Sequence, residues 1–291
     1  MKKIQLFSIA MLMVLAIKAQ DSITTISEKP ASDSVLINDA KTVFHFASTR
    51  PSFAEGILLV PSGKAQVELG LAYSYFKGNS HEIQHPNFLL KYGISKYFEF
   101  RISGDATTYK SETSRQTGLH PVYIGMKIKM IDAKKYAPGS SFVGGLSVNF
   151  ISTKNFRTKY VAPYFKITME QFLPKNFGMV YNYGLIWNGE DAKPTYNFAV
   201  NTNYTKVLKS KSEDKHQQLK AFLEVYGIYP QGYPVDVRMN AGVSYLLNKF
   251  LQFDVSVGAG LLKNSPRVIT SAGLVVRFPK KDKVKKEKSK K

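Results

Sequence analysis

Apolar and polar residues alternate along most of the chain between residues 65 and 278, in segments of about ten residues that each end at a turn. The clearest segment is QVELGLAYSYF at residues 66–76, in which Val67 and Leu69 alternate with Glu68 and Gly70. Side chains of a strand point alternately to its two faces. Each segment therefore predicts a strand with one apolar and one polar face.

Twelve segments of this kind are predicted as strands. An even number is typical of bacterial outer-membrane barrels, and ten or fourteen strands stay open as alternatives if a segment is merged or split. The predicted outer loops are short, and the longest connector, LKSKSEDKHQ, falls on the periplasmic side. The strands are predicted at residues 65–76, 86–93, 98–109, 120–130, 141–152, 161–172, 177–187, 195–206, 219–229, 235–246, 250–261 and 267–278.

Aromatic residues gather at the two ends of the apolar faces. A transmembrane barrel carries such girdles at both membrane interfaces, whereas a soluble β-sandwich collects its aromatic residues in mid-strand, in the core. We therefore predict an all-β fold, a transmembrane antiparallel β-barrel of about 12 strands with short loops. One girdle is predicted at Tyr92, Phe98, Phe142, Tyr204, Tyr245 and Phe278, and the other at Tyr75, Phe150, Trp187, Tyr196 and Tyr229.

The first residues have the pattern of a secretory signal peptide: two lysines, an apolar run from Ile4 to Ile17, and Ala19 at the cleavage position. The run is short for a transmembrane helix, which needs about 20 residues, although an uncleaved anchor is the alternative. The predicted division is a signal peptide at 1–19, a flexible periplasmic lead-in at 20–48, an opener (RPSFAEG…VPSG) at the periplasmic mouth at 49–64, the β-barrel at 65–278, and a lysine-rich disordered tail at 279–291.

An exported barrel is expected in the bacterial outer membrane, with both termini in the periplasm. Its expected partners are outer-membrane lipids, lipopolysaccharide and the barrel assembly machinery. The last strand ends in an outward aromatic residue, Phe278, which resembles the C-terminal signal read by that machinery, although the chain continues beyond it.

The amino-acid composition excludes several kinds of site and argues against one class of protein. The chain has no cysteine, which excludes disulfides, thiolate metal sites and a lipid-modified cysteine. The formal net charge of +20 would suggest nucleic-acid binding, but export and the strand pattern argue against it. Anionic lipids, lipopolysaccharide phosphates or anionic solutes are the expected partners of this charge.

No catalytic arrangement stands out. The five histidines are scattered, and no Ser–His–Asp set or strained nucleophile turn is present. We expect no enzyme activity, no metal site and no cofactor.

The polar strand faces carry the candidate site, because they face the lumen. In an open pore, inward lysines and arginines would favour anions. The alternative is a lumen whose charges pair with one another, since an isolated buried charge is costly. The predicted lumen and selectivity residues are Lys127, Lys129, Lys166, Arg101, Arg238, Glu68, Glu99, Glu170, Glu224 and Asp254.

Two charged residues of the opener, Arg50 and Glu55, lie before the first strand. We predict that they fold the lead-in across the periplasmic mouth, as a plug, by pairing with charges of the lumen. The alternative is a surface turn fixed by Pro51 and Pro61.

Three stretches resemble a known family. They are RPSFAEGILLVPSGKAQVELGLAYSY, NFLLKYGISKYFEFRISGD, and AFLEVYGIYPQG followed by MNAGVSYLLNKFLQFDVSVGAGL and GLVVRF. Together they resemble the outer-membrane transporters grouped as the "MetA-pathway of phenol degradation" family, over most of residues 49–278. The resemblance implies a barrel and a link to the uptake of aromatic or hydrophobic compounds, and it includes no catalytic signature.

Two functions follow from these observations as hypotheses. The first is a transporter or porin that passes small solutes, aromatic or anionic ones included. The alternative is a non-conducting structural or interaction barrel, closed by paired charges and the lead-in.

Overall fold

A computed structural model describes residues 43–134, 137–208 and 216–279, and the fold is that of the unit Asp33–Lys291. The predicted signal peptide, most of the predicted lead-in and the tail beyond residue 279 lie outside the described residues. No helix of the described part is long and apolar enough to cross a membrane.

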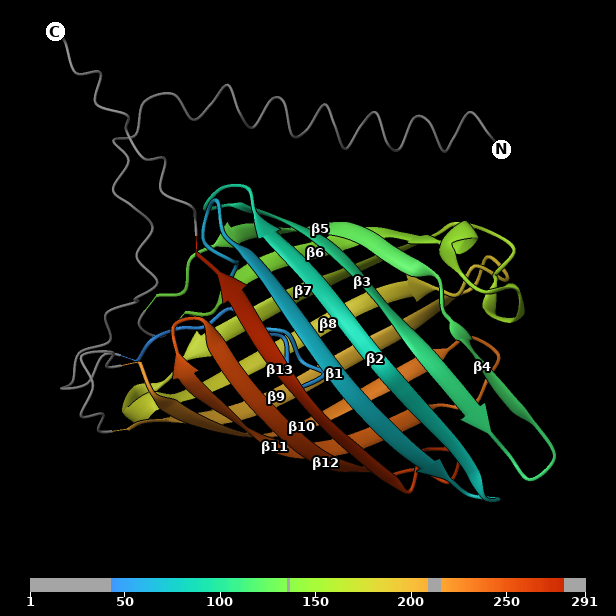
Figure 1. Ribbon diagram of the computed structural model, residues 1–291. Coiled ribbons are helices and arrows are strands. Elements are labelled where there is room, and N and C mark those ends of the chain that lie inside the picture. Colours follow the sequence, from blue (N-terminus) through green and yellow to red (C-terminus); the bar gives the residue numbers. More distant parts are fainter. Residues whose placement is uncertain (1–42, 135–136, 209–215, 280–291) are drawn as a thin grey trace, which may run out of the picture. The chain divides into compact units, whose positions relative to one another are not determined.

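Thirteen antiparallel strands form one sheet (Figure 1). Three short 3-10 helices lie in the connectors: η1 (Asn149–Ile151), η2 (Lys154–Phe156) and η3 (Pro174–Asn176). The strands are β1 (Ala65–Phe76), β2 (Ser80–Gly93), β3 (Phe98–Lys110), β4 (Arg115–Leu119), β5 (Val122–Ile131), β6 (Gly139–Val148), β7 (Ala162–Phe172), β8 (Phe177–Trp187), β9 (Pro194–Val207), β10 (Gln218–Pro230), β11 (Asp236–Asn248), β12 (Leu251–Gly260) and β13 (Val268–Phe278).

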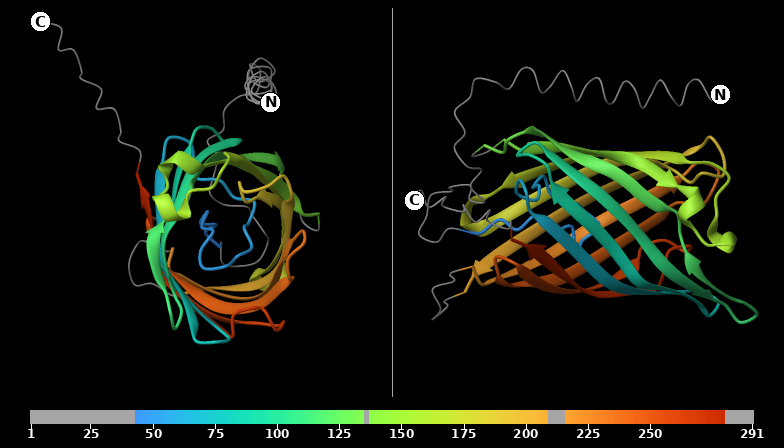
Figure 2. Two further views of the ribbon diagram at one scale, coloured as in Figure 1. Left: turned by 90° about the vertical axis from the view of Figure 1, so that its right-hand side faces the viewer. Right: turned by 45° about the horizontal axis from the view of Figure 1, so that its top comes forward.

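The sheet closes into a barrel because β1 has a partner on each side (Figure 2). It pairs with β2 and with β13, so that Leu69 lies opposite both Phe88 and Leu274. The short β4 and the longer β5 both pair with β3, at successive positions along it. Thirteen strands therefore fill twelve positions of the wall, and the predicted twelve-stranded antiparallel barrel is confirmed.

Two predicted strands begin in the wrong place. The strand predicted at 86–93 begins at Ser80, after a tight turn in which Gly78 and Asn79 have φ of 79° and 53°. The strand predicted at 120–130 begins at Arg115 and is interrupted between β4 and β5.

Proline accounts for both differences. Pro86 lies where the pairing of β2 with β3 shifts register, between Gln84 and Asn87, and Pro121 lies in the gap between β4 and β5. Proline has no N–H group to donate to the ladder, so it interrupts the pairing. The wall nevertheless continues past each proline, because a bulge or a short gap absorbs the missing bond.

The strand predicted at 141–152 ends at Val148. Its last residues form η1, so Phe150, which we predicted in a wall girdle, lies in a connector instead. Phe150 is among the most exposed apolar residues of the described chain.

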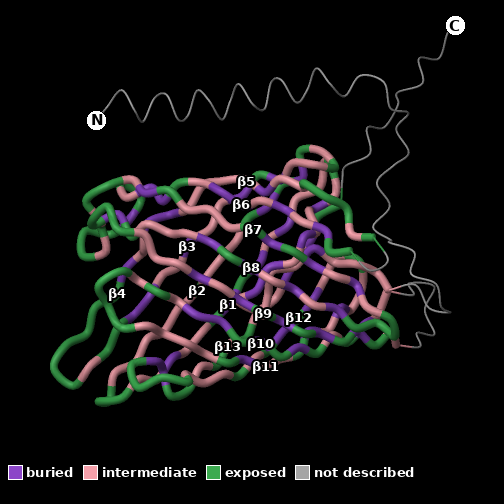
Figure 3. Tube along the Cα trace, turned by 180° about the vertical axis from the view of Figure 1, so that it is seen from behind, coloured by how far each residue is buried: buried purple, intermediate pink, exposed green. Residues whose placement is uncertain are grey.

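Buried and exposed residues alternate along the strands (Figure 3), and the buried ones are not those of a water-soluble protein. The largest fully buried side chains are polar: Lys127, Gln66, Glu68, Glu99 and Glu224. Apolar side chains on the outer face of the same strands are exposed. An apolar exterior around a polar interior is typical of barrels that face lipid. The exposed outward residues include Leu71, Tyr92, Leu223, Phe253, Val255, Val257 and Phe278.

The two ends of the barrel differ. The terminal end carries the start of β1 and the end of β13, where Ala65 pairs with Phe278. The loop end carries the connector 149–161 with η1 and η2. These names are used below for the two mouths, and in Figure 1 the terminal end lies at the left.

Candidate functional site

The segment that precedes β1 runs inside the barrel. Residues 43–64, called the plug below, contain no helix or strand, and Figure 2 shows them within the ring of strands. Backbone N–H and C=O groups that are buried without regular structure need other partners. The inner face of the wall supplies these partners.

Four wall glutamates accept hydrogen bonds from backbone amides of the plug. Glu224 binds two successive amides, those of Phe53 at 2.8 Å and Ala54 at 3.0 Å. The wall glutamates thus replace the strand or helix that the plug lacks. The other bonds run from Thr49 to Glu68 at 3.2 Å, from Ile57 to Glu170 at 2.9 Å, and from Val60 to Glu99 at 2.6 Å.

Carbonyl groups of the plug are bound by donors of the wall. The Nζ atom of Lys127 donates to the carbonyls of Gly56 at 2.5 Å and Leu58 at 3.1 Å. The Asn182 side chain accepts from the amide of Glu55 at 2.7 Å and donates to its carbonyl at 2.9 Å. Further donors are Ser141, to Ile57 at 2.8 Å, and Gln66 and Lys91, to Ala47 at 2.8 Å and 3.1 Å.

Three wall cations converge on the carboxylate of Glu55. Its Oε1 atom lies 2.7 Å from Arg101 and 3.0 Å from Lys127, and its Oε2 atom lies 3.1 Å from Lys166. Burial by itself would raise the pKa of Glu55. The three cations lower this pKa by more than burial raises it, so it lies well below its usual range. Glu55 is therefore charged at neutral pH.

A second charged side chain of the plug, Arg50, enters a space made by two glycines. Its guanidinium lies 3.1 Å from Asp254 and 2.8 Å from the side-chain oxygen of Asn87. Gly70 and Gly273 pair across β1 and β13, and a Cβ atom at either position would overlap the guanidinium. The absence of two side chains thus opens the place that Arg50 fills.

We expect Gly70→Val to displace Arg50 and loosen the plug, because the new side chain takes the space of the guanidinium. Amide hydrogen exchange at Phe53 and Ala54 should accelerate, since their bonds to Glu224 depend on the plug's position. The matched control is Ala72→Val on the same face of β1, which should leave exchange unchanged. Equal protection in both variants would contradict this packing.

The structure places the ten predicted lumen residues on the inner face of the barrel, and eight of them contact the plug. Lys129 and Arg238 do not. Lys129 pairs with Asp132 in the turn after β5, and Arg238 donates to Asp236 at 2.8 Å near the loop end. Phe278 ends β13 with an exposed ring, and its assembly role stays a prediction.

Four wall side chains that bind the backbone of the plug are not among the predicted lumen and selectivity residues. Gln66, Lys91, Ser141 and Asn182 all occupy inward positions of their strands. The alternation of the strands gives that orientation, but it does not say that a separate segment would fill the lumen.

Apolar and aromatic side chains of the plug also contact the wall. The rings of His45 and Phe172 meet edge to face with centroids 4.6 Å apart, and Ile57 and Val60 are almost fully buried. The ring of Phe53 stacks on Tyr226 with centroids 4.3 Å apart and planes 8° from parallel. Ala54 completes the buried cluster with Val180, Ala199 and Tyr226. Hydrogen bonds, ion pairs and apolar contacts thus all bind the plug.

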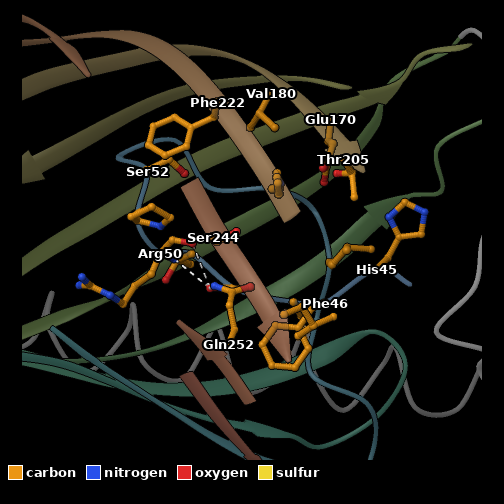
Figure 4. A pocket seen from close by; sticks show the side chains of 18 of the residues that line it. His45, Phe46, Arg50, Ser52, Glu170, Val180, Thr205, Phe222, Ser244 and Gln252 are labelled. Carbon is orange, nitrogen blue, oxygen red and sulfur yellow. Dashed lines mark hydrogen bonds between the residues drawn. The ribbon is translucent and has the colours of Figure 1, made fainter. Parts of the chain in front are cut away.

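Cavities remain on both sides of the plug. A cavity of about 80 Å³ lies beside its first residues, and its lining includes His45, Phe46, Arg50 and Gln252 (Figure 4). A larger cavity of about 270 Å³ lies toward the loop end. Within the described chain, no three His, Asp or Glu side chains are grouped closely enough to share a metal ion.

A family model described as "Putative MetA-pathway of phenol degradation" matches residues 48–278. The chain belongs to this family. The matched residues include most of the plug as well as the whole wall, which confirms the resemblance inferred from the sequence. No curated protein sequence matches the chain.

Solved structures share the barrel of this MetA-pathway family member. An outer-membrane channel from Pseudomonas putida F1 aligns with a TM-score of 0.56 and 11% identity, over 79% of this chain and 100% of the channel. At this identity the likeness concerns the fold. Two porins align less well. The KdgM porin in complex with oligogalacturonate has a TM-score of 0.47 and 10% identity, over 73% of this chain and 99% of the porin. The NanC porin has a TM-score of 0.45 and 10% identity, over 72% of this chain and 100% of the porin.

Proposed function

We propose that this protein is an outer-membrane channel for small solutes that its own plug closes. The observation that carries the proposal is the path of residues 43–64 through the lumen, bound by wall side chains on both sides. The apolar exterior and the fold shared with an outer-membrane channel support the membrane location.

The chemistry of the plug supports a closure that can be reversed. The contacts of the plug include many hydrogen bonds and ion pairs, which water can replace when the segment leaves the lumen. The inner wall is polar, so it loses little when water enters. Apolar packing alone would stabilise a permanently filled lumen better than buried ion pairs do, and the plug combines both kinds of contact.

The solutes that fit the wall are small, and anionic or aromatic ones are favoured. Withdrawal of Glu55 would leave Arg101, Lys127 and Lys166 facing water, and cations in a pore favour anions. With both termini in the periplasm, the plug would enter from the periplasmic side. Outer-membrane lipids, lipopolysaccharide and the barrel assembly machinery complete the proposed partners.

Single-channel recording of the refolded mature protein tests this function. We expect a mostly closed barrel with brief openings that select anions. Neutralising Lys127 and Lys166 together should reduce the anion preference of those openings. A folded barrel that never conducts, with or without the plug, would favour the non-conducting structural alternative.

The proposed membrane location predicts the effect of a charge on the outer wall. Val255 lies in the middle of β12 with its side chain exposed. Val255→Arg should destabilise the barrel by about 2–4 kcal/mol in lipid vesicles, because arginine is costly at the bilayer midplane. Leu262→Arg, in the exposed connector after β12, is the control and should change stability by less than about 1 kcal/mol. Urea titration in vesicles measures both, and equal effects would contradict the membrane position.

A further inference from the structure

The larger cavity has the composition of a binding site. Its volume is about 270 Å³, and it lies between the plug and the halves of β5, β7, β8 and β9 nearest the loop end. Ligand sites are typically apolar enclosures with a few well-placed polar groups. Here the apolar and aromatic lining comes from Phe53, Tyr123, Val143, Tyr164 and Ile186.

Two rings of the lining form a rigid wall. Tyr123 and Tyr164 meet edge to face, with centroids 5.2 Å apart and planes at 88°. Rings in this arrangement present flat apolar surface and few conformations. A flat apolar body therefore fits against them.

One polar side chain in the cavity has no partner. Asn197 on β9 is only 4% exposed, and its side-chain amide makes no hydrogen bond with any described residue. Buried side-chain amides are almost always hydrogen-bonded. The amide of Asn197 is therefore available to a molecule that enters the cavity.

The cations of the cavity are already occupied by a carboxylate from the plug. Arg101 and Lys166 both line it and both bind Glu55. The side chain of Lys166 is 21% exposed, against 5% for Arg101 and 1% for Lys127. An anion arriving from the loop end therefore reaches Lys166 first and meets Glu55 as its competitor.

We propose that the cavity binds a small organic carboxylate with a flat apolar body, and that Glu55 occupies the position of the solute's carboxylate. The inference rests on the proposed channel for the arrival of the solute. The solute and the plug then compete for Arg101 and Lys166, so binding favours the withdrawn plug. The solute would thereby open its own path.

Titration calorimetry with benzoate on the refolded mature chain tests the site, and benzamide is the uncharged probe of the same shape. Glu55→Gln should bind benzoate at least about tenfold more tightly, equivalent to 1.4 kcal/mol, because the competing charge is gone. Benzamide binding should not change. Lys166→Met should weaken benzoate binding about tenfold. Lys220→Met, an inward lysine near the terminal end, is the matched control and should leave it unchanged.

The proposal is overturned if Glu55→Gln binds benzoate no more tightly than the natural chain, or if Lys220→Met weakens binding as much as Lys166→Met. If Glu55→Gln does not fold, Lys166→Met and Asn197→Leu decide the matter. Both variants must weaken benzoate binding. Benzamide binding must stay unchanged in Lys166→Met and weaken in Asn197→Leu.

Conductance of the same samples separates this inference from the channel itself. If benzoate binds as expected but the barrel never conducts, the carboxylate site is supported and the proposed channel function is wrong. If the barrel conducts but the variants do not change benzoate binding as expected, the channel function is supported and the carboxylate site is wrong.

Discussion

A barrel that lacks residues 20–61 should conduct continuously. The plug crosses the lumen and is bound by wall side chains, and without it a polar twelve-stranded interior admits water. We expect the mean conductance in a planar bilayer to rise on the order of tenfold over the full mature chain. The deletion keeps the turn at Gly63, whose amide donates to the carbonyl of Gly93 at 2.7 Å, so β1 still begins in place.

The control for this deletion removes Glu190 and Asp191 from an exposed connector at the loop end. It shortens the chain without touching the lumen and should leave conductance unchanged. Equal conductance with and without the plug would show that another element closes the barrel.

Thiol labelling gives an independent view of the same closure, because the chain has no cysteine of its own. Ala54→Cys should resist a charged thiol reagent in the closed barrel, since Ala54 is 3% exposed, whereas Ser62→Cys at the mouth should react. Rapid labelling at both positions would mean that the plug leaves the lumen most of the time.

The wall could be predicted from the sequence because its signal is periodic and local. Alternation along β1 or β12 fixes which side chains face the lumen, and the inward positions of Glu68 and Asp254 follow directly. The starts of two strands were predicted wrongly, at Pro86 and near Pro121, because each proline interrupts the hydrogen bonds between neighbouring strands. Only the pairing with β3 on both sides of each proline shows that the wall continues.

The plug could be predicted only in part, because it has no periodicity. Arg50 and Glu55 stood out as charges beside a polar lumen, and the structure gives each an opposite charge on the wall. The bonds from glutamates to the plug's backbone amides have no sequence signal, since any residue other than proline offers the same N–H group. The structure shows that Gly70 and Gly273 make room for Arg50, but a missing side chain does not say in the sequence what fills its space.

The wall strands also explain why the plug can be specific without secondary structure. Each wall glutamate lies at a fixed height on its strand, so successive amides of the plug find acceptors at fixed places. A shift of the plug by one residue would misplace all of these bonds together. These bonds are therefore made together in one register, as the proposed gate requires.

Glu55→Gln should weaken the closed state more than any other single change in the plug. The variant leaves Arg101, Lys127 and Lys166 without their shared carboxylate, and removing one partner of a buried ion pair costs about 3–5 kcal/mol. A loss of about 3 kcal/mol would accelerate amide exchange at Phe53 and Ala54 on the order of a hundredfold, since exchange there reports plug opening.

Glu190→Gln is the matched control for that substitution, because Glu190 also binds a lysine, Lys159, at 3.3 Å, but on the exposed loop end. Exposed ion pairs contribute about 0–1 kcal/mol, so exchange in the plug should not change in this variant. The two variants make the same chemical substitution in different surroundings. Unchanged exchange in Glu55→Gln as well would mean that the backbone bonds to the four wall glutamates, and not the charge of Glu55, keep the channel closed.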